Sequence, residues 1–300
     1  MDQTWISHKW PPLGAWDSHV HVVNEDKFPL HDLHPYRPQK APLPSLQAFH
    51  RSLGISHACL VAFSVYHTDN RCLVDALSRM GGKARGVACI DPTNVSDDEL
   101  RMLHEAGVRG IRLNLLTRSE ALDKDAVRLA AARVRHLGWI VQMYVSLDQI
   151  VELAPLVPEL GVDIVIDHIG SPHEGRGPGR LQPGYAEFIG LLKTGRVWTK
   201  LSAAYRFPDV PDIDEYVLDI LRTAPDRVVW ASDWPHSGGV EANPGGDRKK
   251  IQEYRKVDNA AWVAQCWGWC RRVEGGSGDG LARKIWIDNP RRLWQYDSED

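Results

Sequence analysis

The sequence predicts an α/β protein built as one (β/α)8 barrel, the TIM barrel fold. Three observations support this. A short β-branched run followed by an amphipathic segment recurs eight times, and 300 residues suffice for eight such units. No glycine-rich phosphate turn follows the first strand, as an open doubly wound sheet would require. We therefore expect residues 1–300 to form a single domain.

Eight apolar runs of strand length are the expected barrel strands. They cover residues 15–22, 57–63, 84–90, 108–114, 139–145, 163–169, 197–203 and 227–233. Apolar residues at helical spacing predict helices over 45–54, 70–82, 96–107, 123–138, 147–160, 184–194, 212–223 and 258–273. In the 96–107 helix, Ser96 and Glu99 form a capping box. This alternation predicts parallel strands joined by crossover helices.

Two longer segments leave the C-terminal ends of the expected strands. Residues 24–44 are proline-rich and follow the first strand, and residues 235–257 are rich in glycine and charge and follow the eighth. Because active sites of these barrels lie at that end, both are expected to be active-site rim loops. For 235–257, a functional loop and a solvated insertion remain equally open.

Composition excludes several classes of partner. The formal net charge of -3 gives no signal for binding nucleic acid. The five cysteines have no disulfide-framework spacing, and no apolar stretch reads as a leader or a membrane span. We therefore expect a cytoplasmic protein without membrane or nucleic-acid partners. Its oligomeric state cannot be read from the sequence.

Polar side chains gather at the C-terminal ends of the expected strands. The first strand, W-D-S-H-V-H-V-V (16–23), places Asp17, His19 and His21 on one face. We expect Asp17, one layer deeper, to orient the histidines. Further polar residues lie at or just after the other strands: Ser64, Arg112, Arg118, Tyr144, His168, Arg206 and Asp233. Buried polar groups cost free energy unless paired, so this convergence favours a site over packing.

The residue types indicate an anionic substrate. Arginines bind carboxylates bidentately, and three of them, Arg112, Arg118 and Arg206, suggest a dicarboxylate. The alternative, that some of them pair with acidic residues on neighbouring loops, stays open. Asp233 beside several histidines is a natural general base for a water. The histidines could polarise a carbonyl or hold a metal.

These motifs resemble the amidohydrolase superfamily. The shared features are D-x-H-x-H in the first strand, the histidine of D-H-I-G (167–170), and S-D-W-P-H (232–236). Within the amidohydrolase-2 branch, the chain is most similar to the 2-pyrone-4,6-dicarboxylate lactonases. Five further stretches carry this closer likeness: F-P-L-H-D-L-H-P-Y-R-P (28–38), H-T-D-N (67–70), A-R-G-V-A (84–88), L-H-E-A-G-V-R-G-I-R-L-N (103–114) and D-N-P-R-R-L (288–293).

The resemblance implies a hydrolase that reversibly opens the lactone of an anionic, dicarboxylated ring such as 2-pyrone-4,6-dicarboxylate. It implies that Asp233 is the general base and that His19, His21 and His168 polarise the carbonyl. It also implies a set of substrate-binding residues: Arg112, Arg118, Arg206, Tyr144, Tyr36 and Ser64.

The resemblance further implies catalysis without a metal, so no cofactor is favoured. Arg112 and Tyr144 stand where many metal-binding relatives use Lys or His. A single Zn²⁺ or other divalent ion nevertheless has a candidate ligand set: His19, His21, His168 and Asp233.

Three alternative functions remain open. The first is a metal-dependent decarboxylase of an aromatic or enol carboxylate. The second is a sugar-acid lactonase or isomerase of the same branch, which would need fewer arginines at the rim. The third, a non-catalytic binding protein, would be expected to lack part of the constellation, whereas Asp233 and the three histidines are all present.

Overall fold

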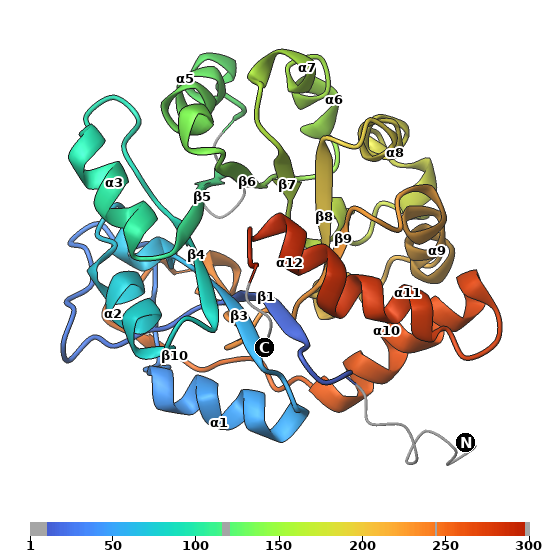
Figure 1. The fold of residues 1–300 in the computed structure, drawn as a ribbon, viewed down its shortest axis with the longest axis horizontal. Coiled ribbons are helices and arrows are strands. Elements are labelled where there is room, and N and C mark those ends of the chain that lie inside the picture. The colour runs from blue at the N-terminus through green and yellow to red at the C-terminus, as the bar shows by residue number, and fades with distance from the viewer. Residues whose placement is uncertain (1–10, 116–120, 244, 298–300) are drawn as a thin grey trace.

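Eight parallel strands close into a barrel in the computed structural model, which describes residues 11–115, 121–243 and 245–297 (Figure 1). Neighbouring strands pair in the order β1-β3-β4-β5-β6-β7-β8-β9. The first strand meets the segment just after the last one: Val20 forms an isolated parallel bridge with Trp234, and Asp233 N donates to His19 O at 3.1 Å. This is the predicted (β/α)8 barrel.

All eight predicted strands are confirmed. Their bounds are β1 Trp16–Val20, β3 His57–Val61, β4 Ala84–Ala88, β5 Val108–Asn114, β6 Ile140–Tyr144, β7 Ile164–Ile166, β8 Val197–Leu201 and β9 Val228–Trp230. Most are shorter at their C-terminal ends than the apolar runs suggested. The residues that follow leave the sheet and form the mouth of the barrel.

Helices surround the strands as an outer ring (Figure 1). They are α1 Leu43–Leu53, α2 Arg71–Arg79, α3 Asp97–Glu105, α5 Lys124–Val134, α6 Ile150–Leu153, α7 Val157–Leu160, α8 Tyr185–Lys193, α9 Ile213–Thr223, α10 Asn259–Glu274, α11 Asp279–Arg283 and α12 Asn289–Leu293. Ser96 Oγ accepts the hydrogen bond of Glu99 N at 3.1 Å, as the capping box predicts. The single helix predicted over 147–160 is wrong. It is divided into α6 and α7, because Pro155 cannot donate within a helix.

The N-terminal end of the barrel is closed by the C-terminal segment of the chain. Leu293, Trp294 and Tyr296 pack in one apolar cluster with Trp16 of β1 and Trp198 of β8. The rings of Trp16 and Tyr296 meet edge to face, with centroids 5.0 Å apart. This end of the barrel is therefore an aromatic plug.

The prediction that Asp17 orients the histidine side chains is wrong. The register of β1 against β3 shifts within β1, which interrupts the simple alternation of faces. Asp17 instead accepts hydrogen bonds from the backbone N of Ser232 at 2.9 Å and of His19 at 3.4 Å. Its other oxygen lies 3.4 Å from His50 Nε2 on α1. Asp17 thus ties together backbone around the mouth.

The two predicted rim segments, 24–44 and 235–257, contact each other over the mouth. Strand β2 (Arg37–Pro38) in the first pairs with β10 (Ile251–Gln252) in the second. Ser237 Oγ donates to Tyr36 Oη at 3.1 Å. A side chain at Gly238 would lie 2.4 Å from Ala242 Cβ, so glycine allows the close turn here.

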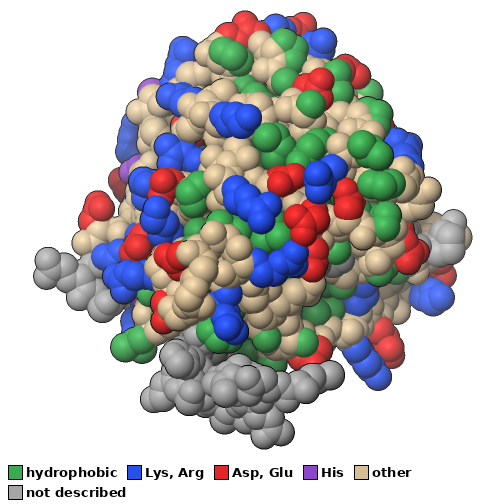
Figure 2. All heavy atoms as spheres, turned by 90° about the vertical axis from the view of Figure 1, so that its right-hand side faces the viewer, with side chains coloured by type: hydrophobic (Ala, Val, Ile, Leu, Met, Phe, Trp, Pro, Cys, Tyr) green, Lys and Arg blue, Asp and Glu red, His purple; other side chains and the backbone are tan. Residues whose placement is uncertain are grey.

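The surface carries both signs of charge. On the face shown in Figure 2, acidic and basic side chains are interspersed without a large field of one sign. Arg272 of α10, for example, pairs with Asp214 and Glu215 of α9 at 2.7 Å each. None of the helices in the described ranges combines the length and apolar character needed to cross a bilayer.

Candidate active site

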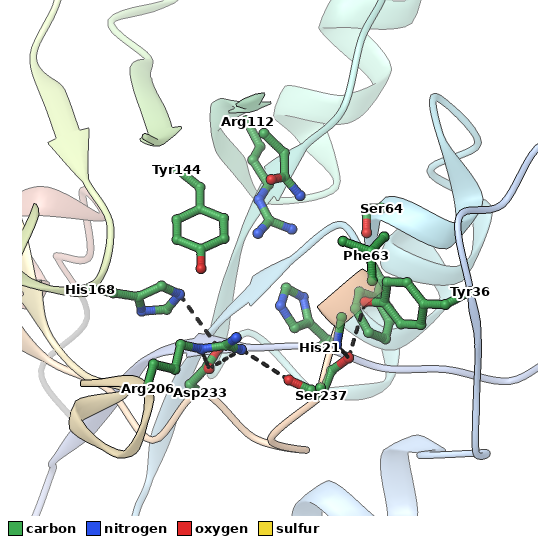
Figure 3. A pocket seen from close by; sticks show the side chains of 14 residues that line it. His21, Tyr36, Phe63, Ser64, Arg112, Tyr144, His168, Arg206, Asp233 and Ser237 are labelled. Atoms are coloured by element: carbon green, nitrogen blue, oxygen red, sulfur yellow. Dashed lines mark hydrogen bonds and ion pairs between the residues drawn. The ribbon is translucent and has the colours of Figure 1, made fainter. Parts of the chain in front are cut away.

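A pocket of about 520 Å³, measured with the solvent at its mouth, lies at the C-terminal end of the barrel (Figure 3). It brings together most of the residues predicted from the sequence: His21, Tyr36, Ser64, Arg112, Tyr144, His168, Arg206 and Asp233. His19 lies beneath it, with its Nε2 atom 3.2 Å from His21 Nε2. Arg118 lies outside the described residues.

Asp233 has two carboxylate oxygens in different surroundings. Oδ2 accepts hydrogen bonds from Tyr205 Oη at 2.5 Å and from Arg206 Nη2 at 3.0 Å. Oδ1 lies 3.8 Å from Nε2 of His19 and 3.8 Å from Nε2 of His168. One oxygen is therefore anchored, and the other faces the histidines.

The backbone aims Asp233 and His168 into the pocket through unusual conformations. His168 lies two residues after β7 and Asp233 three residues after β9, and both adopt left-handed backbone, with φ of 63° at Asp233 and 51° at His168. Residues other than glycine rarely adopt this region, and such strain concentrates at functional sites.

The carboxylate of Asp233 is ionised. Burial alone would raise its pKa, but the Arg206 guanidinium holds the pKa of Asp233 well below its usual value. The group is thus in the state needed to accept a proton from water at neutral pH.

The three histidines are neutral. Burial is the largest cause in each case. With Arg112 adding to it, burial lowers the pKa of His21 to about 3. Burial lowers the pKa of His168 to about 4, against the opposing effect of Asp233. Burial and Lys200 hold the pKa of His19 well below its usual value. At neutral pH each ring therefore has one protonated and one bare nitrogen.

The bonding partners decide which nitrogen is protonated. His21 Nδ1 lies 2.8 Å from the carbonyl of Val61, which can only accept, so Nδ1 holds the proton and Nε2 is an acceptor. This argues against the carbonyl-polarising role predicted for His21. His168 Nδ1 lies 2.8 Å from Ser202 Oγ, a hydroxyl that can donate, which allows Nε2 of His168 to carry a proton into the pocket.

Two supporting groups contain residues that the sequence places near the pocket but to which it gives no supporting role. The first is a fully buried network beneath the pocket, made of Lys200, Asp167 and Gln142. Its only sequence signal is the lysine inside the apolar run V-W-T-K-L. The second is Tyr205, whose hydroxyl holds Asp233. The signal there is its position next to Arg206, directly after β8.

Of the three arginines predicted to bind substrate, the structure describes Arg112 and Arg206, and these two differ in their partners. Arg206 pairs with Asp233 and also donates to Ser237 O at 3.1 Å. Arg112 is buried and donates to Ala62 O at 3.3 Å, and it has no carboxylate partner among residues 11–115, 121–243 and 245–297. Its guanidinium points into the pocket beside Tyr144 (Figure 3). Arg112 is thus placed to receive an anionic ligand.

Two sets of described residues have the ligand atoms to hold a metal ion. They are His19, His21 and Asp233 in one set, and His19, Asp167 and His168 in the other.

Comparison with known proteins identifies the family. The amidohydrolase family model Amidohydro_2 matches residues 16–295. The chain belongs to the amidohydrolase family. It is 33% identical over 298 residues to the 2-pyrone-4,6-dicarboxylate hydrolase of Comamonas testosteroni, covering 94% of this chain and 90% of that protein. It is 34% identical over 291 residues to the 4-sulfomuconolactone hydrolase of Rhizobium radiobacter, with the same coverage.

Solved structures agree with this assignment. A candidate 2-pyrone-4,6-dicarboxylic acid hydrolase from Pseudomonas putida is 30% identical, with a TM-score of 0.78 over 96% of this chain and 100% of that one. An amidohydrolase from Burkholderia multivorans with bound zinc shares the fold at 17% identity, with a TM-score of 0.67 over 94% of this chain and 99% of that one. The predicted family and fold are confirmed for this amidohydrolase.

Proposed function

We propose that this amidohydrolase is a lactonase that reversibly opens the ring ester of a carboxylated ring such as 2-pyrone-4,6-dicarboxylate. One observation carries the proposal. A buried arginine without a described carboxylate partner, Arg112, shares a pocket with an ionised carboxylate, Asp233, whose Oδ1 faces two imidazoles. The named activities of the two relatives, both hydrolases, support it.

The charges of the site favour an anionic substrate. Arg112, Arg206 and Lys200 are cations, Asp167 and Asp233 are anions, and the three histidines are neutral. These groups sum to a net positive charge, which attracts carboxylates. Arg112 would bind one carboxylate in a bidentate manner. Arg206 is proposed to bind a second, with Arg118 and the hydroxyls of Tyr36, Ser64 and Tyr144 completing the set.

Water activation is assigned to Asp233 and His21. Asp233 Oδ1 and His21 Nε2 are both acceptors, so a water between them donates its two hydrogens to them and turns a lone pair to the lactone carbonyl. Asp233 takes the proton as the water oxygen bonds to the carbonyl carbon. When the ring C–O bond breaks, the enolate oxygen takes that proton from Asp233. The reverse reaction uses the same groups in the opposite order.

Stabilisation of the oxyanion is assigned to His168 and His19 through their Nε2–H groups. Without substrate, His19 Nε2–H donates to His21 Nε2, 3.2 Å away. With substrate and water bound, this N–H is proposed to turn to the oxyanion, and His21 Nε2 then accepts from the water. Donors of this kind typically contribute about 3–4 kcal/mol each when they are preorganised in a site that excludes water. Both rings are almost fully buried, which fulfils that condition.

The reaction is proposed to need no metal. Tetrahedral zinc with bonds of about 2.0–2.1 Å would place its ligand atoms about 3.3–3.4 Å apart. The separations of 3.2 Å and 3.8 Å from His19 Nε2 to His21 Nε2 and Asp233 Oδ1 are near that value. The donor chemistry does not fit, because Arg206 is paired with Asp233 and Lys200 lies 3.0 Å from His19 Nδ1. A dication would add to a cluster that is already positive.

A substrate panel tests the proposal. Purified protein is mixed with 2-pyrone-4,6-dicarboxylate, a pyrone monocarboxylate, an uncharged lactone, an aldonolactone and an aromatic carboxylate, and ring opening and CO₂ release are followed. We expect ring opening to be fastest for the dicarboxylate, and the opened product to re-form the ring. CO₂ release from the aromatic acid would favour the decarboxylase alternative. A preference for the aldonolactone would favour the sugar-acid alternative.

A further inference from the structure

Lys200 occupies a position that ordinary core packing does not explain. It lies on β8 inside the barrel, fully buried, and its ammonium nitrogen meets three acceptors. These are Gln142 Oε1 at 2.7 Å, His19 Nδ1 at 3.0 Å and Asp167 Oδ1 at 3.2 Å. An ammonium group has three hydrogens and no acceptor, so the hydrogen bonds to Gln142 and His19 together with the ion pair to Asp167 suit its charged form.

The orientation of Gln142 agrees with a charged Lys200. Gln142 Nε2 donates to Asp167 Oδ2 at 2.9 Å, and Oε1 of the same amide receives Lys200. The flipped amide would place an NH₂ group against the ammonium and an oxygen against the carboxylate. The network therefore has one consistent assignment of donors and acceptors.

We propose that Lys200 fixes His19 in the tautomer protonated on Nε2, and that this tautomer makes the histidine cluster a hydrogen-bond donor instead of a metal site. An ammonium can only donate, so His19 Nδ1 must be bare, and the ring proton lies on Nε2. A doubly protonated ring would direct a second N–H against Lys200.

The next contact in the chain agrees with this tautomer. Nε2 of His19 lies 3.2 Å from Nε2 of His21, so one of these nitrogens must donate and the other accept. His21 donates through Nδ1 to Val61 O, which leaves its Nε2 as the acceptor. Hydrogen bonds thus run in one direction from Lys200 through His19 and His21 to Val61.

This direction decides what the cluster can bind. A metal needs the lone pair of His19 Nε2, and in this tautomer a proton occupies it. Without Lys200, Nδ1–H of His19 could donate to Asp167 Oδ1, 3.4 Å away. That is the carboxylate–histidine arrangement that supports metal-bound histidines. Lys200 is therefore a positioning residue. By keeping the proton on Nε2 of His19, Lys200 makes an N–H group available to the oxyanion. This contribution to lactone hydrolysis rests on the proposed function.

The tautomer can be measured in the unmodified protein. Long-range ¹H–¹⁵N spectra of ¹⁵N-histidine-labelled full-length protein distinguish the two tautomers, and the His19 signals are assigned by their absence in His19→Gln. We expect His19 protonated on Nε2. A wild-type ring protonated on Nδ1 would overturn the proposal, whether or not any variant folds.

Zinc binding provides the second readout. Wild-type, Lys200→Met and Gln142→Met proteins are equilibrated with Zn²⁺, desalted and analysed for metal. Gln142→Met is the matched control, because it removes a buried partner of Lys200 and keeps the contact to His19. We expect about one zinc per chain in Lys200→Met, with His19 switched to Nδ1–H, and no stoichiometric zinc in the other two.

Two results would contradict the proposal here: stoichiometric zinc on wild-type His19, or a folded Lys200→Met protein whose tautomer and zinc content match the wild type. Neither readout uses a substrate. A protein that opened no lactone but showed the Lys200-dependent tautomer would therefore defeat the proposed function and leave this inference standing.

Discussion

The two ends of the barrel are built from the same eight strands and differ sharply in chemistry. At the N-terminal end, Trp16, Trp198 and Trp294 pack in an apolar cluster. Toward the other end, the interior holds the buried charges of Lys200, Asp167 and Asp233. On β8, Trp198 and Lys200 are only two residues apart. Along one strand the side chains change from packing to electrostatics.

This difference separates stability from chemistry. Burial of aromatic and aliphatic surface stabilises the fold, whereas burial of charge costs free energy that is offset only by pairing. Substitutions in the plug should therefore lower the free energy of unfolding and spare catalysis. Substitutions at the mouth should lower catalytic activity and change the free energy of unfolding much less.

The largest effect is expected for Asp233→Asn. The amide keeps the shape but cannot accept the proton of water, so kcat/KM for ring opening should fall by about 10³–10⁴-fold. Steady-state kinetics in both directions measure this. Asp226→Asn is the control, because the Asp226 carboxylate pairs with Lys284 at the surface and does not line the pocket. Turnover of Asp233→Asn within tenfold of the wild type would remove Asp233 as the base.

Leu293→Ala should destabilise the aromatic plug at the N-terminal end of the barrel. Leu293 is almost fully buried in the plug, and such a truncation should lower the free energy of unfolding by about 2–5 kcal/mol. Urea unfolding measures this, with Leu181→Ala as control because Leu181 is 81% exposed. The kcat/KM of the folded variant should stay near the wild-type value. A large loss of activity at full folding would mean that the two ends are coupled.

Arg112→Gln should change substrate selection. Hydrogen bonds to charged groups contribute about 1.5–3 kcal/mol, so kcat/KM for the dicarboxylate should fall about 10–150-fold. An uncharged lactone should be affected much less. Arg109→Gln, on the same strand, removes hydrogen bonds only to backbone carbonyls and serves as control. Equal losses for both substrates would exclude Arg112 as a carboxylate ligand.

The smallest effect is expected from acidification. The pKa values of His21 and His168, about 3 and about 4, lie below that of a free histidine. The rings thus stay neutral as pH falls through 6.5, and kcat/KM should change less than about twofold between pH 7.5 and 5.5. The unfolded chain binds more protons than the folded protein in this range. The free energy of unfolding should therefore decrease as the pH is lowered. An activity loss with a midpoint near 6.5 would show that an ordinary histidine controls the reaction.

The fold could be predicted because its signals are local. Alternating strands and helices, the cap at Ser96 and the polar strand ends are all visible in short stretches. The break between α6 and α7 is also signalled locally, by Pro155. The face of Asp17 could not be read, because a register shift against another strand determines it.

The roles within the site depend on distant partners. The proton position on His21 depends on the carbonyl of Val61, and that on His19 depends on Lys200, 181 residues away. The residue types showed that a site exists. Only the three-dimensional contacts indicate which nitrogen donates and which accepts.

We propose that this amidohydrolase opens a carboxylated lactone without a metal. This metal-independent activity is tested most directly by measuring kcat/KM for 2-pyrone-4,6-dicarboxylate on chelator-treated protein whose metal content is determined on the same sample. We expect undiminished ring opening without stoichiometric metal. Failure to open the ring, or activity lost with the chelator and restored by zinc, would contradict it.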